Sequence, residues 1–171
     1  MNDSAVATDV IALALQRADA TARPAMAANF THPLWVMSPA EFRAFWGGTR
    51  LASVGTAGAT GAPHAAPVEV TLRGDTFVVP SFASTVRLED LRANPRIVLT
   101  AWDDAYHAAI VYGQATFADA STGMVSVEVR PTRIYAIRAP NGHPHARGPS
   151  PDGPASNSST QSQTRERLEE V

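Results

Sequence analysis

The chain has 171 residues and a formal net charge of -2, which suits one domain with a sizeable core and implies no strongly basic face for nucleic acid. It has no cysteine and all 14 basic residues are arginine, which excludes disulfides, thiolate metal sites, thiol nucleophiles and lysine Schiff bases. No apolar run reaches the roughly 20 residues that span a bilayer, and no basic segment opens a signal peptide, so we expect a cytoplasmic protein without membrane contacts.

The first 37 residues are predicted to form a helix and an extension. Apolar residues recur at helical spacing from Ser4 to Ala20, and Arg23-Pro24 is expected to end this helix. Residues 25–37 mix apolar and polar types without a clear period. We therefore expect them to pack on the following domain without regular structure.

Residues 38–139 are predicted to form a mainly β domain that opens with a short helix. Ser38, Pro39 and Glu41 make a capping box, and Gly47-Gly48 ends the helix. Alternating apolar residues separated by turn residues then predict strands, and a helix is predicted over Thr85 to Ala93. The predicted strands are Arg50 to Thr56, His64 to Leu72, Thr76 to Pro80, Arg96 to Trp102, His107 to Phe117, and a last one with Val125, Val127 and Val129 that continues after Pro131.

The segment from residue 140 to residue 171 differs in composition from the rest of the chain. It is rich in Pro, Gly, Ser, Asn and Gln and has almost no large apolar residues, so we expect a disordered tail. His143 and His145 lie there on either side of a proline. Two histidines without a carboxylate or cysteine partner are a weak metal pattern, and no metal site is predicted.

The start of the helix at Thr85 is predicted to be an anion site of phosphate size. The free N–H groups and the dipole of a helix N-terminus favour an anion, and Arg87 adds a positive charge whose fork suits phosphate oxygens. Thr85 and Ser81 offer two hydroxyl groups nearby. The alternative is an ordinary capped surface helix with a solvated arginine.

The order of these segments resembles the FMN-binding split-barrel family. That family includes pyridoxamine 5′-phosphate oxidase and relatives that use FMN or the deazaflavin F420. The matching pieces are RLASVG, GAPHAAPVEV, STVRLEDLRANPRIVL and VYGQATF, within Arg50 to Phe117 and more loosely Val125 to Arg138. The resemblance implies a six-stranded antiparallel split barrel with a few short helices. It also implies a homodimer whose cofactor lies in a groove between the subunits.

The same resemblance implies particular cofactor contacts. The phosphate of FMN would be held by Thr85 and Arg87, with Ser81 beside it. Apart from the resemblance, Trp102 at the end of a strand is a candidate for the ligand groove, and the alternative is an ordinary core or interface residue. Backbone groups can make many of the ring contacts. The residues that it places beside the ring are Ala66, Pro67, Val68 and Glu69. For the longer anionic tail of F420, the candidate contacts are Arg50, Arg92 and Arg96.

The chain also departs from the oxidases of this family. Those enzymes carry arginines where Ala66 and Val86 stand, a glutamine near Ala108, and a C-terminal substrate clamp that is missing here. We therefore expect not vitamin B6 oxidation but a flavin- or deazaflavin-dependent oxidoreductase that acts on a small organic substrate. The alternative is a non-catalytic barrel that binds FMN, haem or another flat ligand. No catalytic residue is assigned, although His64 and His107 are candidate proton donors as well as ordinary polar strand residues.

Overall fold

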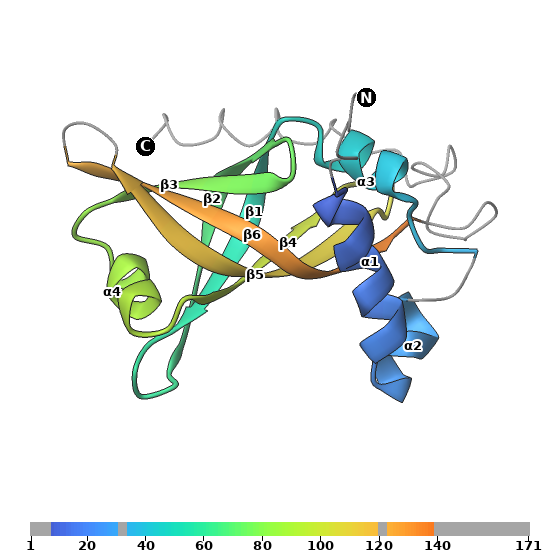
Figure 1. The fold of residues 1–171 in the computed structure, drawn as a ribbon, viewed down its shortest axis with the longest axis horizontal. Helices are drawn as coiled ribbons and strands as arrows, with labels where there is room; N and C mark the ends of the chain where they lie inside the picture. The colour runs from blue at the N-terminus through green and yellow to red at the C-terminus, as the bar shows by residue number, and fades with distance from the viewer. Residues whose placement is uncertain (1–7, 31–33, 120–122, 139–171) are drawn as a thin grey trace, which may run out of the picture.

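The computed structural model describes residues 8–30, 34–119 and 123–138. Six strands form one closed antiparallel barrel in the order β1-β2-β3-β6-β5-β4, which confirms the predicted fold class (Figure 1). The predicted tail, with His143 and His145, lies outside the described residues. The strands are β1 (Thr49–Ala57), β2 (Pro63–Arg73), β3 (Thr76–Phe82), β4 (Arg96–Trp102), β5 (Ala108–Asp119) and β6 (Met124–Ile137).

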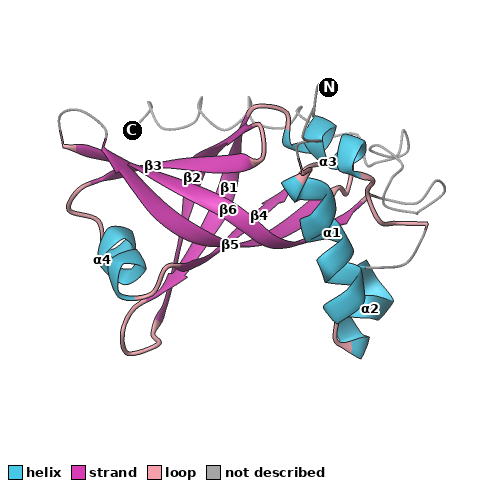
Figure 2. Ribbon diagram, viewed as in Figure 1, coloured by secondary structure: helices cyan, strands magenta, loops and turns pink. Residues whose placement is uncertain are grey.

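Four helices surround the barrel in the described part of the chain, and Figure 2 shows them against the strands. They are α1 (Val10–Thr21), α2 (Pro24–Phe30), α3 (Pro39–Trp46) and α4 (Val86–Ala93). Helix α1 packs against β6, and α3 and α4 lie at opposite ends of the barrel (Figure 1). No helix among the described residues is long and apolar enough to cross a membrane.

Helix α2 corrects the sequence-based expectation of irregular structure over residues 25–37. Pro24 is its first residue, where a proline suits a helix because the first N–H groups have no intrahelical acceptor. Phe30 packs edge-on against Tyr135 of β6, with ring centroids 5.9 Å apart. The contact of this short helix with the barrel overrides its weak periodicity.

Helix α3 closes one end of the barrel. The predicted capping box is present, because Ser38 accepts from the N–H of Glu41 and Glu41 accepts from the N–H of Ser38. Gly47 ends the helix in the left-handed region, with φ 48°. The helix buries Phe42 and Trp46, and Trp46 lies edge-on against Phe77 of β3 with ring centroids 4.7 Å apart.

An arginine of α3 fastens the N-terminal helix to the barrel. Arg43 forms ion pairs with Asp9, the N-cap of α1, at 2.8 Å and with Asp75 in the β2–β3 turn at 2.6 Å. Asp75 also accepts from the N–H of Val10 at 2.9 Å. These bonds fix the start of α1 beside α3 and the turn.

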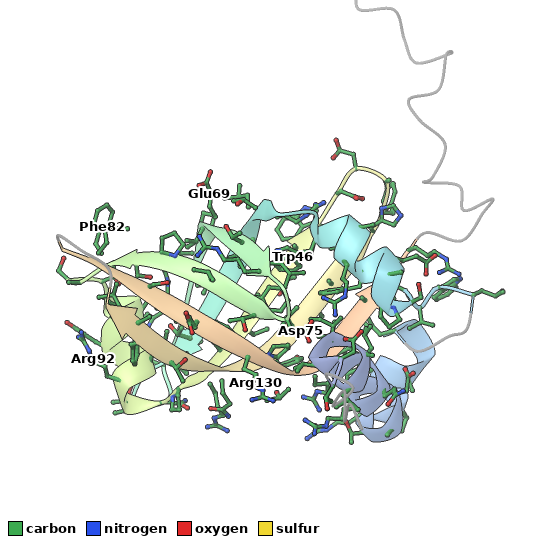
Figure 3. All side chains as sticks on the ribbon, turned by 45° about the horizontal axis from the view of Figure 1, so that its top comes forward. Trp46, Glu69, Asp75, Phe82, Arg92 and Arg130 are labelled. Atoms are coloured by element: carbon green, nitrogen blue, oxygen red, sulfur yellow. The ribbon has the colours of Figure 1, made fainter. Side chains whose placement is uncertain are left out.

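The barrel core comes from the alternation that predicts the strands. On β1 the inward residues Ala52, Val54 and Thr56 are buried, while Leu51 is 65% exposed on the other face. The registers pair Leu51 with Glu69 of β2, and Glu69 points away from the barrel in Figure 3. One face of these strands therefore fills the barrel and the other is an outer surface.

Strand β6 runs through Pro131 without a break. Pro131 is paired with Gly113 of β5, at a register shift between Tyr112 and Gly113. A β-carbon on Gly113 would lie 2.5 Å from Cγ1 of Val129 and 2.8 Å from the carbonyl oxygen of Arg130. Glycine lets the two backbones approach there, and the bulge accommodates a proline that cannot donate to the ladder.

The barrel is split beside β2. All nine residues of β1 pair with β2, but β2 pairs with β3 only through Thr71, Leu72 and Arg73. Strand β3 then pairs with β6 from Phe77 to Phe82. Within the described residues, the first part of β2 therefore has no strand partner on its side toward β3, and its backbone groups remain available along that edge.

Candidate functional site

The predicted phosphate ligands meet where β3 ends and α4 begins, a place that we call the α4 corner (Ser81, Thr85 and Arg87). Ser81 is the last inward residue of β3 and is 2% exposed. The guanidinium of Arg87 donates to Oγ of Ser81 at 2.9 Å. Burial lowers the pKa of Arg87 from its ordinary value, yet an arginine keeps its charge in proteins. The corner thus holds a half-buried positive charge beside a hydroxyl group.

Thr85 contributes an unsatisfied group to the same corner. It is the N-cap of α4 in an extended conformation, but its side chain makes no capping hydrogen bond. Its Oγ1 is buried and has no hydrogen-bond partner within the part of the chain that the structure describes. Since a buried hydroxyl without a partner is costly, and the first N–H groups of α4 also need an acceptor, the corner fits an oxyanion such as a phosphate.

The residues predicted to lie beside a cofactor ring divide between the two faces of β2. Pro67 and Glu69 are exposed on the outer face, whereas Ala66 and Val68 share the inward side with buried Val70. Neither face alone therefore presents all four residues to a ring, and the backbone of this first part of β2 is open on its side toward β3. Their role as ligands stays a prediction.

Trp102 lies on the outer face as well, at the end of β4, and is 63% exposed. Its carbonyl oxygen accepts from Arg50, whose guanidinium also donates to the carbonyl of Phe45 in α3. Arg50 is therefore at the α3 end of the barrel, whereas Arg92 belongs to α4 and Arg96 follows that helix. The structure does not bring together the three arginines that were predicted for an F420 tail.

A buried carboxylate fastens α4 to the β1–β2 hairpin. Asp90 of α4 is 5% exposed and accepts from Oγ1 of Thr56 and from Nδ1 of His64, each at 2.7 Å. The hydrogen bonds from Thr56 and then His64 hold the pKa of Asp90 below its usual range in spite of burial. His64 thus supports the helix that carries the α4 corner, a role that links residues 26 and 34 positions apart in sequence.

We expect the hydrogen bonds of Asp90 to Thr56 and His64 to stabilise the fold at neutral pH and to lose this contribution in acid. Because the folded pKa of Asp90 lies below the ordinary carboxyl value, its bonds stabilise the fold above that value, and the contribution is lost as the pH falls through the folded pKa. Thr56→Val should cost about 1–3 kcal/mol of unfolding free energy at neutral pH. The difference from wild type should shrink on acidification below about pH 4. Denaturant titrations at several pH values measure both effects.

The control for this prediction is Thr60→Val. Thr60 is exposed in the β1–β2 turn and takes no part in the hydrogen bonds to Asp90. This variant should unfold like wild type at every pH. Equal effects of the two substitutions, or a Thr56→Val effect that grows on acidification, would show that the network is not what holds α4.

His107, the second candidate proton donor, lies at the opposite end of the barrel. Its Nδ1 is 2.9 Å from the carboxylate of Asp103, which also accepts from the N–H groups of Ala105 and His107. Asp103 therefore shapes the β4–β5 turn. A cavity of about 380 Å³ lies beside it, between α3 and this turn, with Phe45 and Arg50 in its wall.

The fold and the unpaired edge of β2 define the class of this protein as a split β-barrel. Its likeness to one solved structure of low identity supports the fold alone, and two others are similar to it more loosely. A conserved hypothetical protein from Mycobacterium tuberculosis has 17% identity and a TM-score of 0.58, over 63% of this chain and 88% of that one. An F420 reductase has 15% identity and a TM-score of 0.45, over 49% and 88%. A haem storage protein from Vibrio cholerae has 12% identity and a TM-score of 0.48, over 57% and 91%.

The family follows from the sequence match. The family model described as pyridoxamine 5′-phosphate oxidase matches residues 38–144, which is more than half of the chain. The chain belongs to this family, and the resemblance inferred from its sequence is confirmed. A search of the curated proteins found no match.

Proposed function

We propose that the protein binds FMN, or alternatively F420, and acts as an oxidoreductase on a small organic substrate. The observation that carries this proposal is the α4 corner, where a half-buried arginine, a buried serine and an unpartnered buried threonine hydroxyl surround a helix N-terminus. Membership of a family whose name refers to an oxidase supports the same reading.

Different residues would bind the phosphate and the ring of the cofactor. Thr85, Arg87 and Ser81 would hold the phosphate, and the unpaired edge of β2 would offer backbone donors and acceptors to the ring. A bound flavin or deazaflavin supplies the hydride chemistry, so the chain itself needs to provide only position, charge and exclusion of water. This division agrees with a sequence in which no catalytic acid or base is assigned.

We also propose that the site is completed by a second copy of the chain. Phe82 and Val86, which flank the α4 corner, are 67% and 52% exposed. Leu51 and Trp102 are exposed on neighbouring strands of the outer face, at 65% and 63%. Large apolar side chains in this arrangement are typical of an interface, and a homodimer would cover them.

A substitution on the outer face tests the homodimer. Leu51→Glu should convert the dimer to a monomer, because it puts a charge into an apolar contact, and light scattering measures the mass directly. Leu13→Glu is the matched control, since Leu13 is partly exposed on α1, away from this face. A wild-type protein that is monomeric at tens of micromolar would contradict the proposal, on the usual mass-action argument.

The colour of the purified protein tests the oxidoreductase proposal. We expect a flavin or deazaflavin absorbance spectrum and the mass of FMN or F420 in the material released by denaturation. The spectrum should bleach with a reductant and recover when a substrate or oxygen accepts the electrons. A bound ligand that cannot be reduced and reoxidised would instead support the second candidate below.

The second candidate is a barrel that binds FMN, haem or another flat ligand without turnover. The observation in its favour is that Ala66 and Val86 stand where the family's oxidases carry arginines, so part of the polar contacts to FMN is absent. A haem spectrum, or a flavin that stays oxidised with every substrate, would favour this candidate. The proposed cytoplasmic location rests on the sequence alone and stays a prediction.

A further inference from the structure

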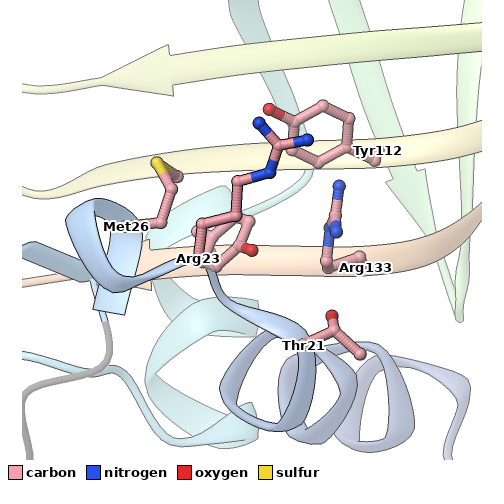
Figure 4. Close-up of a pocket in the computed structure, with 6 residues that line it drawn as sticks. Thr21, Arg23, Met26, Tyr112 and Arg133 are labelled. Carbon is pink, nitrogen blue, oxygen red and sulfur yellow. The ribbon is translucent and has the colours of Figure 1, made fainter.

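A second candidate site lies on the outside of the barrel. A partly open cavity of about 320 Å³ lies between the α1–α2 corner and the outer face of β5 and β6 (Figure 4). This volume is at the lower end of the range found for small-molecule pockets. The cavity is lined by Thr21, Arg23, Met26, Tyr112, Arg133 and Tyr135.

The cavity is distinct from the α4 corner. Its lining residues belong to α1, α2, the link between them, β5 and β6, with none from β3 or α4. Along β6, Arg133 is eight residues from Val125, the strand partner of Ser81. Eight residues of a β-strand span about 26 Å. A ligand of this cavity would therefore bind independently of the proposed cofactor.

The charge of this cavity is positive and uncompensated. Its two charged lining residues are Arg23 and Arg133, and neither forms an ion pair with any residue in the described part of the chain. Arg43 and Arg138, by contrast, have carboxylates at 2.6 to 2.8 Å. Two arginines that share a cavity without a carboxylate favour the binding of an anion.

The guanidinium of Arg133 is held by aromatic rings rather than by an acid. Its central carbon lies 4.7 Å from the ring centroid of Tyr112 and 5.5 Å from that of Tyr135. The two rings are nearly perpendicular, at 84°. Nε of Arg133 is buried and has no hydrogen-bond partner among the described residues. Stacking of this kind fixes the position of an arginine and uses none of its N–H donors.

Arg23 adds a second guanidinium from the other wall. It follows α1 and immediately precedes Pro24, the first residue of α2, so the helix corner fixes its backbone. Figure 4 shows Arg23 and Arg133 both extending in the direction of Tyr112. Met26, on the first turn of α2, supplies an apolar wall.

We propose that this cavity binds a small aromatic anion. Its carboxylate or phosphate would accept hydrogen bonds from Arg23 and Arg133, and its ring would lie against Tyr112 and Met26. Both kinds of head group match the guanidinium fork, and both are recognised by the same donors.

Calorimetric titration of the full chain tests the ligand class. The probes are benzoate and phenyl phosphate, with benzyl alcohol and inorganic phosphate as partial ligands. At least one aromatic anion should bind about 10-fold more tightly than either partial ligand, and the tighter of the two identifies the head group. The absence of binding by both aromatic anions up to about 10 mM, or equal binding of benzyl alcohol, would overturn the proposal.

Three glutamine variants test the site. Arg23→Gln and Arg133→Gln should each weaken binding of the aromatic anion by about 10-fold or more. Arg130→Gln is the matched control on the same strand, because Arg130 is exposed and points away from the barrel in Figure 3. Arg23 is exposed, so its variant remains informative if Arg133→Gln perturbs the fold. The proposal fails if Arg130→Gln weakens binding as much as Arg23→Gln, or if Arg23→Gln binds like wild type.

Discussion

Arg87→Ala is expected to weaken FMN binding by about 10- to 150-fold. A charge-assisted hydrogen bond contributes roughly 1.5–3 kcal/mol, which corresponds to that range of affinity. Arg87→Glu should bind still more weakly, because it places a like charge against the phosphate. Flavin fluorescence quenching during titration measures the dissociation constants of the three proteins.

Arg92→Ala is the control on the same helix. Arg92 lies in the last turn of α4, is exposed, and points away from the barrel in Figure 3. Its removal also takes one positive charge from α4, yet FMN affinity should remain close to wild type. If Arg92→Ala lost as much affinity as Arg87→Ala, the effect would come from the general charge of the helix and not from a phosphate contact.

Trp46→Ala is expected to lower the unfolding free energy by about 3–5 kcal/mol, the usual cost of truncating a buried aromatic side chain. Trp46 is 1% exposed and packs between Phe42 and Phe77 where α3 closes the barrel. Its ring N–H also donates to the carbonyl of Val70 at 3.4 Å. A loss of this size is a large fraction of the stability of an ordinary domain. Denaturant unfolding at one fixed protein concentration measures it.

Trp102→Ala is the control for Trp46→Ala, because it removes an exposed tryptophan instead of a buried one. Trp102 is 63% exposed in the single chain, so its removal should change the free energy of unfolding of the monomer by less than about 0.5 kcal/mol. In the proposed dimer it should instead weaken subunit association. If Trp46→Ala and Trp102→Ala unfolded alike, the described core at the α3 end would be wrong.

The strands could be predicted from sequence because each alternates between a filled barrel and an outer face. β4 begins and ends at the predicted Arg96 and Trp102. The bounds of helix α3 could also be predicted, since its capping box and its terminating glycine are local sequence signals. The Arg23-Pro24 pair predicts a helix end, whereas Pro24 is the first residue of α2; a proline at the first helical position, with Met26 and Phe30 four residues apart, is the signal that indicates this helix.

Only part of the candidate site could be predicted from the sequence. The sequence places Ser81, Thr85 and Arg87 close together because they are near one another along the chain, and the structure adds the bond between Ser81 and Arg87. The hydrogen bonds that hold α4 could not be predicted from the sequence. Asp90 has the pattern of an exposed helix residue, and its partners Thr56 and His64 are distant in sequence. Neighbours from distant strands are set by register and not by local pattern.

Titration of wild-type protein with FMN, F420 and riboflavin tests the central claim most directly. Riboflavin carries the ring of FMN without its phosphate, so it lacks the group that Thr85, Arg87 and the start of α4 are proposed to bind. We predict that FMN or F420 binds at least about 10-fold more tightly than riboflavin. Equal affinity for all three ligands, or binding of none, would contradict a phosphate site at the α4 corner.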